Sequence, residues 1–160
     1  PRSTPIKASA ASDVYKRQDV NITSGKYSIG TYITGIEPGT GAADFVKNIA
    51  VSASGTVKLL TSSGSENGGK IATGNKVAVY DASGNLKKTY DIVIYGDING
   101  DGAVNALDMI KLNRHILGKG TLIGAYLEAA DANRKRDGGN ALDMIIMNRH
   151  ILGKSKISQN

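Results

Sequence analysis

Oxygen-bearing side chains recur on alternate residues between Asp97 and Asp108, in the sequence Asp-Ile-Asn-Gly-Asp-Gly-Ala-Val-Asn-Ala-Leu-Asp. Calcium takes six to eight hard oxygen ligands, which carboxylates, amide oxygens and backbone carbonyls supply. Gly102 stands at the sixth position of this stretch, where a calcium-binding loop turns sharply. We therefore expect residues 97–108, called loop one below, to bind calcium.

Every ligand position of an EF-hand-like loop is filled in loop one. The expected ligands are the side chains of Asp97, Asn99, Asp101, Asn105 and Asp108 and the backbone carbonyl of Ala103. Asn105, at position 9, would reach the ion through water. Asp108 stands at position 12 where glutamate is usual, so the following helix must approach the ion more closely. The alternative is a solvated turn that binds nothing.

Residues 131–143, called loop two below, repeat this pattern with one additional residue. The candidate ligands are Asp131, Asn133, Asp137 and Asp143. Three consecutive basic residues, at 134–136, place positive charge beside the ion and oppose its binding. Two interpretations remain open: the insertion bulges outward and the four ligands converge on a weaker calcium site, or loop two is vestigial.

Each loop leads into a helix, and the two helices are nearly identical. Residues 106–119 recur as residues 141–154, and they differ only where Lys111 and Leu112 are replaced by Ile146 and Met147. The apolar spacing predicts helices over residues 106–117 and 141–152, with a shorter helix over 121–130 between them. Because each loop–helix unit is small, we expect the two apolar stripes to bury each other. The first stripe contains Leu107, Ile110, Arg114 and Leu117, and the residues that widen its apolar arc are Met109, Leu112 and Ile116.

Residues 19–95 have the short, alternating apolar segments that are typical of strands. The expected strands are residues 27–33, 50–52, 57–60, 76–80 and 86–95. The turn at residues 81–84 predicts a hairpin between the last two strands. One short helix is expected over residues 41–48, with Phe45 and Val46 facing inward. This strand spacing favours an immunoglobulin-like sandwich.

The expected fold therefore comprises two small domains. An all-β immunoglobulin-like sandwich over residues 19–95 is followed by an all-α unit over residues 96–154 that contains the two calcium loop–helix repeats. Residues 155–160 are expected to be a tail. Residues 1–18 are expected to lie outside the fold, because Asp13–Gln18 resembles a translated sequencing adapter. The alternative for residues 1–18 is an ordinary linker.

Composition excludes several classes of function. Half of the net charge of +6 lies in residues 1–18, and the remaining basic residues are scattered, so we expect no nucleic-acid partner. The absence of cysteine excludes disulfides. No apolar run is long enough to span a membrane, and no signal peptide is visible, so we expect no membrane insertion and allow that the chain is part of a longer protein.

Loops one and two, the helix after each, and the middle helix together resemble a type I dockerin. That family has a duplicated Asp-x-Asn-x-Asp-Gly-x-Val-Asn-x-x-Asp loop followed by a helix, and the resemblance covers residues 96–154. Residues 19–95 more loosely resemble the immunoglobulin-like X modules that precede dockerins, through residues 32–40, Phe45 and the run into Gly96 and Asp97. The resemblance implies an all-α dockerin fold for the C-terminal domain and bound Ca²⁺ as its cofactor.

Dockerins bind cohesin domains on scaffolding proteins, so the resemblance implies a cohesin as partner. The family contacts cohesin through positions 10 and 11 of each loop and through residues farther along each helix. The matching residues here are Ala106, Leu107, Asn113, Arg114 and His115, and then Ala141, Leu142, Asn148, Arg149 and His150. Small and apolar residues at positions 10 and 11 depart from the Ser-Thr pairs of some members and imply a different cohesin specificity.

The function expected from these features is non-catalytic, calcium-dependent docking of a secreted or cell-surface bacterial protein to a cellulosome-like assembly. We expect the chain to be a monomer without its partner. We expect no enzyme, because no nucleophile–base pair or acid pair stands outside the calcium loops. The alternative is a carbohydrate-binding or spacer β-module of a secreted glycoside hydrolase. The chain has no tryptophan to form a sugar platform, which weighs against carbohydrate binding.

Overall fold

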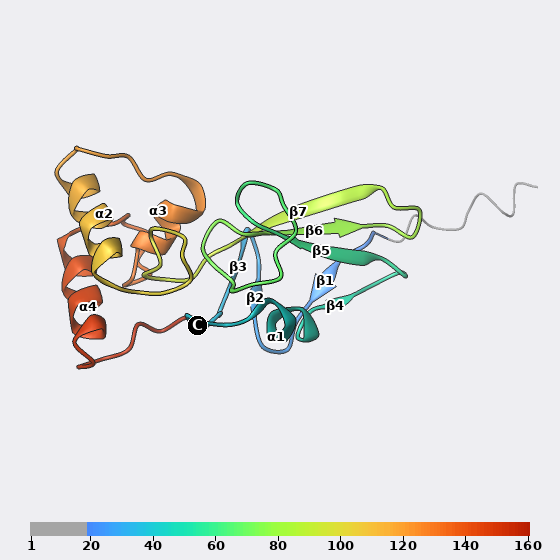
Figure 1. Cartoon of the computed structure of the whole chain (residues 1–160), viewed down its shortest axis with the longest axis horizontal. Helices are drawn as coiled ribbons and strands as arrows, with labels where there is room; N and C mark the ends of the chain where they lie inside the picture. Colours follow the sequence, from blue (N-terminus) through green and yellow to red (C-terminus); the bar gives the residue numbers. More distant parts are fainter. Residues whose placement is uncertain (1–18) are drawn as a thin grey trace, which may run out of the picture.

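The computed structural model describes residues 19–160, and this part of the chain has a mixed α/β fold (Figure 1). Strands occupy one end of the molecule and helices α2–α4 the other, with the C-terminus between them. The elements in chain order are β1 (Ile22–Thr23), β2 (Ser28–Ile29), β3 (Tyr32–Thr34), α1 (Ala42–Lys47), β4 (Ala50–Val51), β5 (Thr56–Leu60), β6 (Lys76–Tyr80), β7 (Leu86–Ile92), α2 (Ala106–Ile116), α3 (Gly124–Ala130) and α4 (Ala141–Ile151).

The larger sheet has five strands in the order β2-β3-β7-β6-β5, and the smaller sheet pairs β1 with β4. β6 and β7 form the hairpin expected from the turn at residues 81–84, in which Gly84 has a φ of +81°. β3 runs parallel to β7, with Ile33 opposite Ile92. Because β7 leads directly to Asp97, this central pair fixes the point from which loop one begins.

Two apolar clusters form the core of the described chain. The first lies between the sheets and α1, where the rings of Tyr27 and Phe45 stack with centroids 5.0 Å apart. The second joins the segment after β7 to the helices, and it contains Val93, Leu112 and Met147 without any solvent exposure. Val93 follows β7, so the second core is built from both ends of the molecule.

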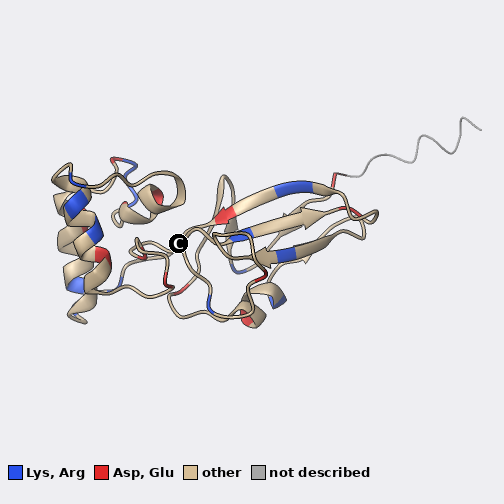
Figure 2. Ribbon diagram, turned by 45° about the horizontal axis from the view of Figure 1, so that its top comes forward, with Lys and Arg blue, Asp and Glu red and all other residues tan. Residues whose placement is uncertain are grey.

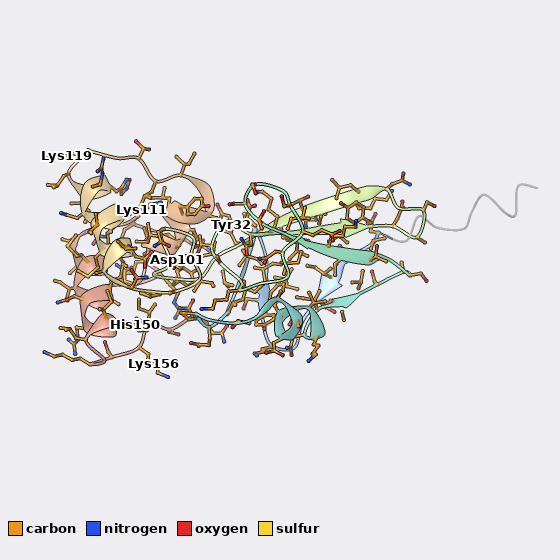
Figure 3. All side chains as sticks on the ribbon, viewed as in Figure 1. Tyr32, Asp101, Lys111, Lys119, His150 and Lys156 are labelled. Atoms are coloured by element: carbon orange, nitrogen blue, oxygen red, sulfur yellow. The ribbon has the colours of Figure 1, made fainter. Side chains whose placement is uncertain are left out.

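Helices α2 and α4 begin and end in the same way. Each begins with an Asn-x-x-Asp capping box, formed by Asn105 with Asp108 in α2 and by Asn140 with Asp143 in α4. Each ends before a glycine with positive φ, Gly118 in the first copy and Gly153 in the second. Lys119 and Lys156, just beyond the two helices, lie at opposite ends of the helical stack (Figure 3). The two helices therefore run in opposite directions, as an internal twofold repeat requires.

The C-terminal segment packs against the start of the helical part. Gln159 has an exposed fraction of 3%, its Oε1 accepts a hydrogen bond from Tyr95 N at 2.8 Å, and its Nε2 donates to Tyr95 O at 3.0 Å. Ile157 is buried in the second core. Residues 155–160, expected from the sequence to be a tail, thus contribute side chains to the core.

The expected fold class is wrong. An immunoglobulin-like sandwich needs two substantial sheets packed face to face. The smaller sheet here has two strands, the larger contains a parallel pair, and four short helices are distributed along residues 19–160. The region after residue 95 is not all-α either, because long loops separate α2, α3 and α4, and Tyr95 from the β side enters its core.

Two local expectations also need correction. Residues 27–33 do not form one strand, because the chain turns at Gly30 and β2 pairs antiparallel with β3. In α1, Phe45 is buried but Val46 is 40% exposed. A helix of six residues presents a single narrow face to the core, and Phe45 fills it.

Residues 1–18, for which the sequence suggested an adapter artefact or a linker, lie outside the described residues. Within residues 19–160, none of the helices has the length and apolar character needed to cross a bilayer.

Candidate metal centre and docking face

Loop one holds the carboxylate of Asp97 in a network of backbone donors. Oδ1 accepts hydrogen bonds from Gly100 N at 2.9 Å and Asp101 N at 3.1 Å. Oδ2 accepts from Gly102 N at 3.1 Å and from Thr73 N at 2.8 Å. Thr73 lies in the connection before β6, outside the loop. The first ligand position of loop one is therefore fixed partly by the β-rich end of the molecule.

Asp108 closes loop one from the first turn of α2. Its Oδ1 accepts hydrogen bonds from Ile98 N and Asn99 N, both at 2.8 Å, and its Oδ2 accepts from Asn105 N at 2.9 Å. Asp97 and Asp108 both have an exposed fraction of 0%. The aspartate at position 12 thus ties the two ends of the loop together as well as facing its interior.

The remaining predicted ligands of loop one lie nearer the surface. Asn99 Oδ1 accepts from Asp101 N at 2.8 Å, and Asn99 Nδ2 donates to Asp101 Oδ2 at 2.8 Å. Asn105 Nδ2 approaches Asp101 Oδ2 at 3.5 Å. Asp101 and Ala103 are exposed. Asp101 therefore gathers the side-chain amides of the predicted ligands at positions 3 and 9.

Loop two brings three carboxylates together. Oxygen atoms of Asp131, Asp137 and Asp143 all lie within 4.8 Å of one another. Among the described residues 19–160, no other three acidic or histidine side chains lie so close together. Asp131 and Asp143 are 2% and 0% exposed, whereas Asp137 lies at the surface. The Nδ2 atom of Asn133, the fourth predicted ligand, is buried beside them without a hydrogen-bond partner in the described structure.

The basic insertion bulges away from these carboxylates. Arg134 and Arg136 both adopt left-handed backbone conformations, with φ of +57° and +58°, and residues 134–136 are exposed. The backbone N–H groups of Lys135 and Arg136 instead turn inward and donate to Asp131, at 3.2 and 2.6 Å. The insertion therefore supplies backbone donors to the first ligand of loop two, while the Arg134 guanidinium lies 5.9 Å from the centre of the Tyr95 ring and the Arg136 side chain extends toward Tyr95 and Glu128.

Burial raises the pKa of Asp97 and Asp108, and of Asp143, although backbone hydrogen bonds oppose part of each rise. The negative charges of Asp131 and Asp137 raise the pKa of Asp143 further. A cation between these groups removes the repulsion and stabilises the charged forms. An all-oxygen ligand set with clustered carboxylates suits calcium and does not suit metals that prefer nitrogen or sulfur. The residues of both loops thus fit calcium.

Helices α2 and α4 expose equivalent apolar side chains. Leu107, Ile110 and Leu117 in the first copy have exposed fractions of 58%, 56% and 57%. Their counterparts in the second copy, Leu142, Ile145 and Leu152, have 57%, 55% and 58%. The expected mutual burial therefore holds for only part of each apolar arc: Leu112 and Met147 are fully buried in the second core, whereas the leucine and isoleucine stripe stays exposed.

Most of the residues predicted to bind a partner lie on these same exposed faces. Leu107 and Leu142 belong to the stripes themselves, and the other exposed members are Ala106, Asn113, Arg114, Ala141, Asn148 and Arg149. Basic residues lie on both helices, Lys111 and Arg114 on α2 and Arg149 on α4 (Figure 2). The sequence analysis did not place Ile110 and Ile145 on this surface. Their recurrence 35 residues apart, at 110 and 145, marks them as equivalent, but periodicity alone does not distinguish an exposed apolar stripe from a buried one.

His115 and His150 have a structural contact in common. His115 Nδ1 accepts a hydrogen bond from Leu122 N at 3.3 Å, and His150 Nδ1 accepts from Ile157 N at 3.1 Å. Both histidines are half-buried. Each one therefore holds the chain that returns after its helix, so the repeat extends through residue 157.

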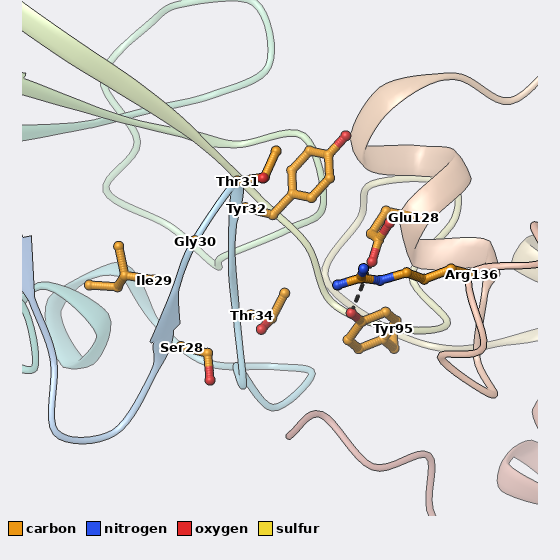
Figure 4. A pocket seen from close by; sticks show the side chains of 9 residues that line it. All are labelled: Ser28, Ile29, Gly30, Thr31, Tyr32, Thr34, Tyr95, Glu128 and Arg136. Carbon is orange, nitrogen blue, oxygen red and sulfur yellow. Dashed lines mark hydrogen bonds between the residues drawn. The ribbon is translucent and has the colours of Figure 1, made fainter.

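A pocket of about 500 Å³ lies between the β2–β3 hairpin and α3 (Figure 4). Tyr95 Oη donates to Glu128 Oε1 at 3.1 Å in its wall, and the Arg136 side chain extends beside them. Burial, together with the charge of Glu128, raises the pKa of Tyr95 to about 12, so its hydroxyl stays protonated. Tyr32 faces the same space from β3. This pocket is lined by residues from both ends of the molecule.

Comparison with known proteins supports one assignment. Residues 95–152 match the family model described as Dockerin type I domain. No curated protein and no solved structure matches the chain. The matched segment spans loop one, α2, α3, loop two and α4. It supports a type I dockerin in this segment and hence a calcium-dependent, non-catalytic module of the kind that binds cohesins. Dockerin modules occur in extracellular proteins. The match does not reach residues 19–94, so an immunoglobulin-like X module is not supported.

Proposed function

We propose that residues 96–154 form a calcium-dependent docking module that binds the cohesin domain of a scaffolding or cell-surface protein. The module attaches a secreted bacterial protein to a cellulosome-like or cell-surface assembly. The observation that carries this proposal is the pair of exposed apolar faces on α2 and α4, which begin directly at the two candidate calcium loops.

The composition of each face suits a protein partner. Soluble monomers rarely expose large contiguous apolar patches, and such patches mark interaction sites. Ile110 and Leu117 lie beside Arg114 on α2, so an apolar centre has a polar rim, as in non-obligate interfaces. A partner that covers this face presents an apolar surface edged with groups that accept hydrogen bonds from arginine.

Calcium acts in this proposal by fixing the start of each helix. Asp108 and Asp143 are the third helical residues of α2 and α4, and each is also the last predicted ligand of its loop. A bound ion therefore sets where each exposed face begins. Because the unfolded chain does not gather these ligands, calcium binding stabilises the folded module.

The duplication supports two orientations of binding. The two helices run in opposite directions and expose equivalent leucine and isoleucine residues, so a half-turn of the module presents the second face where the first had been. The faces are not identical. Lys111 of α2 is exposed and its ammonium group lies 5.9 Å from the centre of the Tyr126 ring, whereas its counterpart Ile146 in α4 is half-buried, so the surroundings of the two faces differ by one positive charge.

Surface plasmon resonance against a panel of type I cohesin domains tests the proposal. Binding is expected with calcium and is lost with a chelator. The double variant Ile110→Asp/Ile145→Asp is expected to abolish binding, because it places a charge at the centre of both faces. Leu86→Asp is the matched control, since Leu86 is equally exposed (56%) but lies on β7. Equal loss in the control, or binding unaffected by the double variant, contradicts the proposed interface.

A second candidate function, carbohydrate binding, rests on the pocket between the β2–β3 hairpin and α3. The pocket offers two tyrosines, Tyr32 and Tyr95, together with Glu128 and Arg136, and such sets of aromatic and polar groups can hold a sugar. Because Glu128 and Arg136 lie outside residues 19–95, the experiment needs the full chain. Glycan-array binding that is lost in Tyr32→Ala and kept in Tyr80→Ala supports this function, and no binding by the wild-type protein excludes it.

A further inference from the structure

We propose that residues 71–73, in the connection before β6, form an outer shell of the calcium site in loop one and set its affinity, while loop two has no such support. Thr73 is the positioning residue. This inference rests on the proposed calcium-dependent function, and it adds that the β-rich end of the molecule tunes one of the two calcium sites.

The direct contact is a buried hydrogen bond. Thr73 N donates to Asp97 Oδ2 at 2.8 Å, and Thr73 and Asp97 are 1% and 0% exposed. Asp97 is the first predicted ligand of loop one, and the other backbone donors to its carboxylate come from within the loop. A donor on this carboxylate fixes which oxygen lone pairs face the ion, as outer-shell groups do in metal sites.

The backbone of loop one also fits closely against this segment. A Cβ atom added to Gly102 would lie 2.5 Å from Ile71 O, and one added to Gly100 would lie 3.0 Å from Thr73 O. Gly102 O accepts a hydrogen bond from Gly39 N at 2.9 Å. The backbone of loop one therefore packs closely against residues 71–73 at the fourth and sixth positions of the loop, Gly100 and Gly102.

Thr73 is held in place by the segment between β7 and loop one. Its Oγ1 accepts from Ile94 N at 3.1 Å and donates to Ile94 O at 3.2 Å. The next residue, Gly74, donates from its backbone to Ile92 O at 2.9 Å. Ile94 is three residues before Asp97. The hydroxyl contacts to Ile94 therefore position the Thr73 N–H group relative to the Asp97 carboxylate. The segment is thus preorganised to receive loop one.

Loop two lacks an equivalent contact. In the described structure, the hydrogen bonds to the Asp131 carboxylate come from Lys135 N and Arg136 N, both within the loop. A change at Thr73 is therefore expected to alter loop one alone. Coupling between sites is reciprocal, so calcium in loop one also stabilises residues 71–73.

The test is a calcium titration of the full-length chain, followed by the NMR signals of the Gly102 and Gly138 amides, one in each loop. Thr73→Val keeps the size of the side chain but removes both hydroxyl hydrogen bonds. It is expected to weaken calcium binding at loop one by about tenfold, as other outer-shell changes do, and to leave loop two unchanged. Thr73→Ser restores the hydroxyl and is expected to restore the affinity. Thr89→Val, at an exposed position of β7, is the control.

Equal weakening of both loops in Thr73→Val, or no weakening of loop one, overturns the inference while leaving calcium binding itself intact. A wild-type chain in which neither glycine responds to calcium overturns the proposed function as well. Should Thr73→Val fail to fold, hydrogen exchange in the wild-type protein decides: calcium is expected to slow exchange of the Thr73 amide by about tenfold or more, because it stabilises the acceptor. An unchanged exchange rate overturns the inference.

Discussion

Loop one and loop two descend from the same pattern but hold their first ligand by different means. In loop one, Asp97 is buried against the β-rich end and accepts a hydrogen bond from Thr73. In loop two, Asp131 is bound only by its own loop within the described structure, yet its carboxylate lies within 4.8 Å of two others. Loop one is thus supported from outside, whereas loop two concentrates charge inside.

This difference shows how a calcium loop can tolerate an insertion. The additional residue and the three basic side chains of loop two are placed outward by two left-handed residues, Arg134 and Arg136. Such conformations are unfavourable for residues other than glycine, so the insertion carries some strain. The strained backbone allows the carboxylates of loop two to stay together despite the insertion. The backbone N–H groups of the inserted segment contact Asp131.

Removing calcium is expected to have the largest effect on both loops. At a calcium concentration of about 100 times Kd, each bound ion adds about 2.7 kcal/mol to the free energy of unfolding. Thermal melting followed by circular dichroism, with calcium and then with a chelator, measures this change. An identical spectrum and melting temperature in the two conditions contradicts calcium-dependent folding.

Substituting one ligand in each loop separates the two sites. Asp108→Asn and Asp143→Asn change matching residues, each of which also belongs to a helix capping box. Each variant is expected to lose about a hundredfold in calcium affinity at its own loop, since even outer-shell changes cost 10–100-fold. Isothermal titration calorimetry then reports one remaining strong site in each variant. If either substitution removes both sites, the loops are not independent.

The pH dependence of stability is expected to have opposite signs with and without calcium. Burial raises the pKa of Asp97 and Asp108, and of Asp143, above their ordinary value of 3.8. In the calcium-free protein these groups therefore favour folding below pH 3.8, and that stability is lost as the pH rises through the raised pKa values. Calcium requires the deprotonated carboxylates, so its stabilising effect grows over the same range.

Melting temperatures measured between pH 4 and 7, in calcium and in chelator, test the sign of this pH dependence. The difference between the melting temperatures in calcium and in chelator is expected to increase with rising pH. Parallel curves show instead that protons and calcium do not compete for the same carboxylates.

A smaller effect is expected where the two loops differ at position 8. Val104 of loop one packs into the second core, whereas Gly139 stands at the corresponding place in loop two. A Cβ atom at Gly139 would lie 2.7 Å from Leu112 Cδ1 and 2.8 Å from Ala130 Cβ. Gly139→Ala is therefore expected to lower the free energy of unfolding by about 1–3 kcal/mol through overpacking. Chemical denaturation measures this change. Gly25→Ala is the control, because a Cβ atom added at Gly25 meets nothing within 4 Å.

The smallest effect concerns the basic insertion. Lys135 is exposed, and its side chain lies in solvent, so its charge acts on loop two only through a high dielectric. Lys135→Gln is expected to raise calcium affinity at loop two by about two- to threefold at low salt, an effect that is lost at high ionic strength because of screening. A salt-independent change indicates a structural cause.

The bounds of α2 and α4 followed closely from the apolar spacing of the sequence, whereas α3, expected to begin at residue 121, begins at Gly124. The helix expected over residues 106–117 is observed as α2, Ala106–Ile116, and Gly118 with its positive φ follows it. The hairpin of β6 and β7 was also predictable, since its turn residues stand next to each other in the chain. Features that depend on neighbouring residues were therefore predicted well.

Features that depend on distant contacts were not predicted. Gln159 binds Tyr95 across 64 residues, and β3 pairs in parallel with β7, and no local pattern indicates either contact. The apolar arc of α2 was expected to be buried against α4, and Leu112 is buried, but Ile110 faces solvent. Amphipathic spacing shows that a helix has an apolar face, but it does not show whether that face meets the core or a partner.

Calcium titration of the wild-type chain by isothermal titration calorimetry tests the central claim most directly, because both loops enter the same measurement. Two ions per chain are expected, with loop two filled as well as loop one, since three carboxylates converge there. A stoichiometry of two agrees with two working sites held by different means. A stoichiometry of one shows that convergence of carboxylates is not sufficient in loop two, and no binding contradicts the calcium-dependent docking function itself.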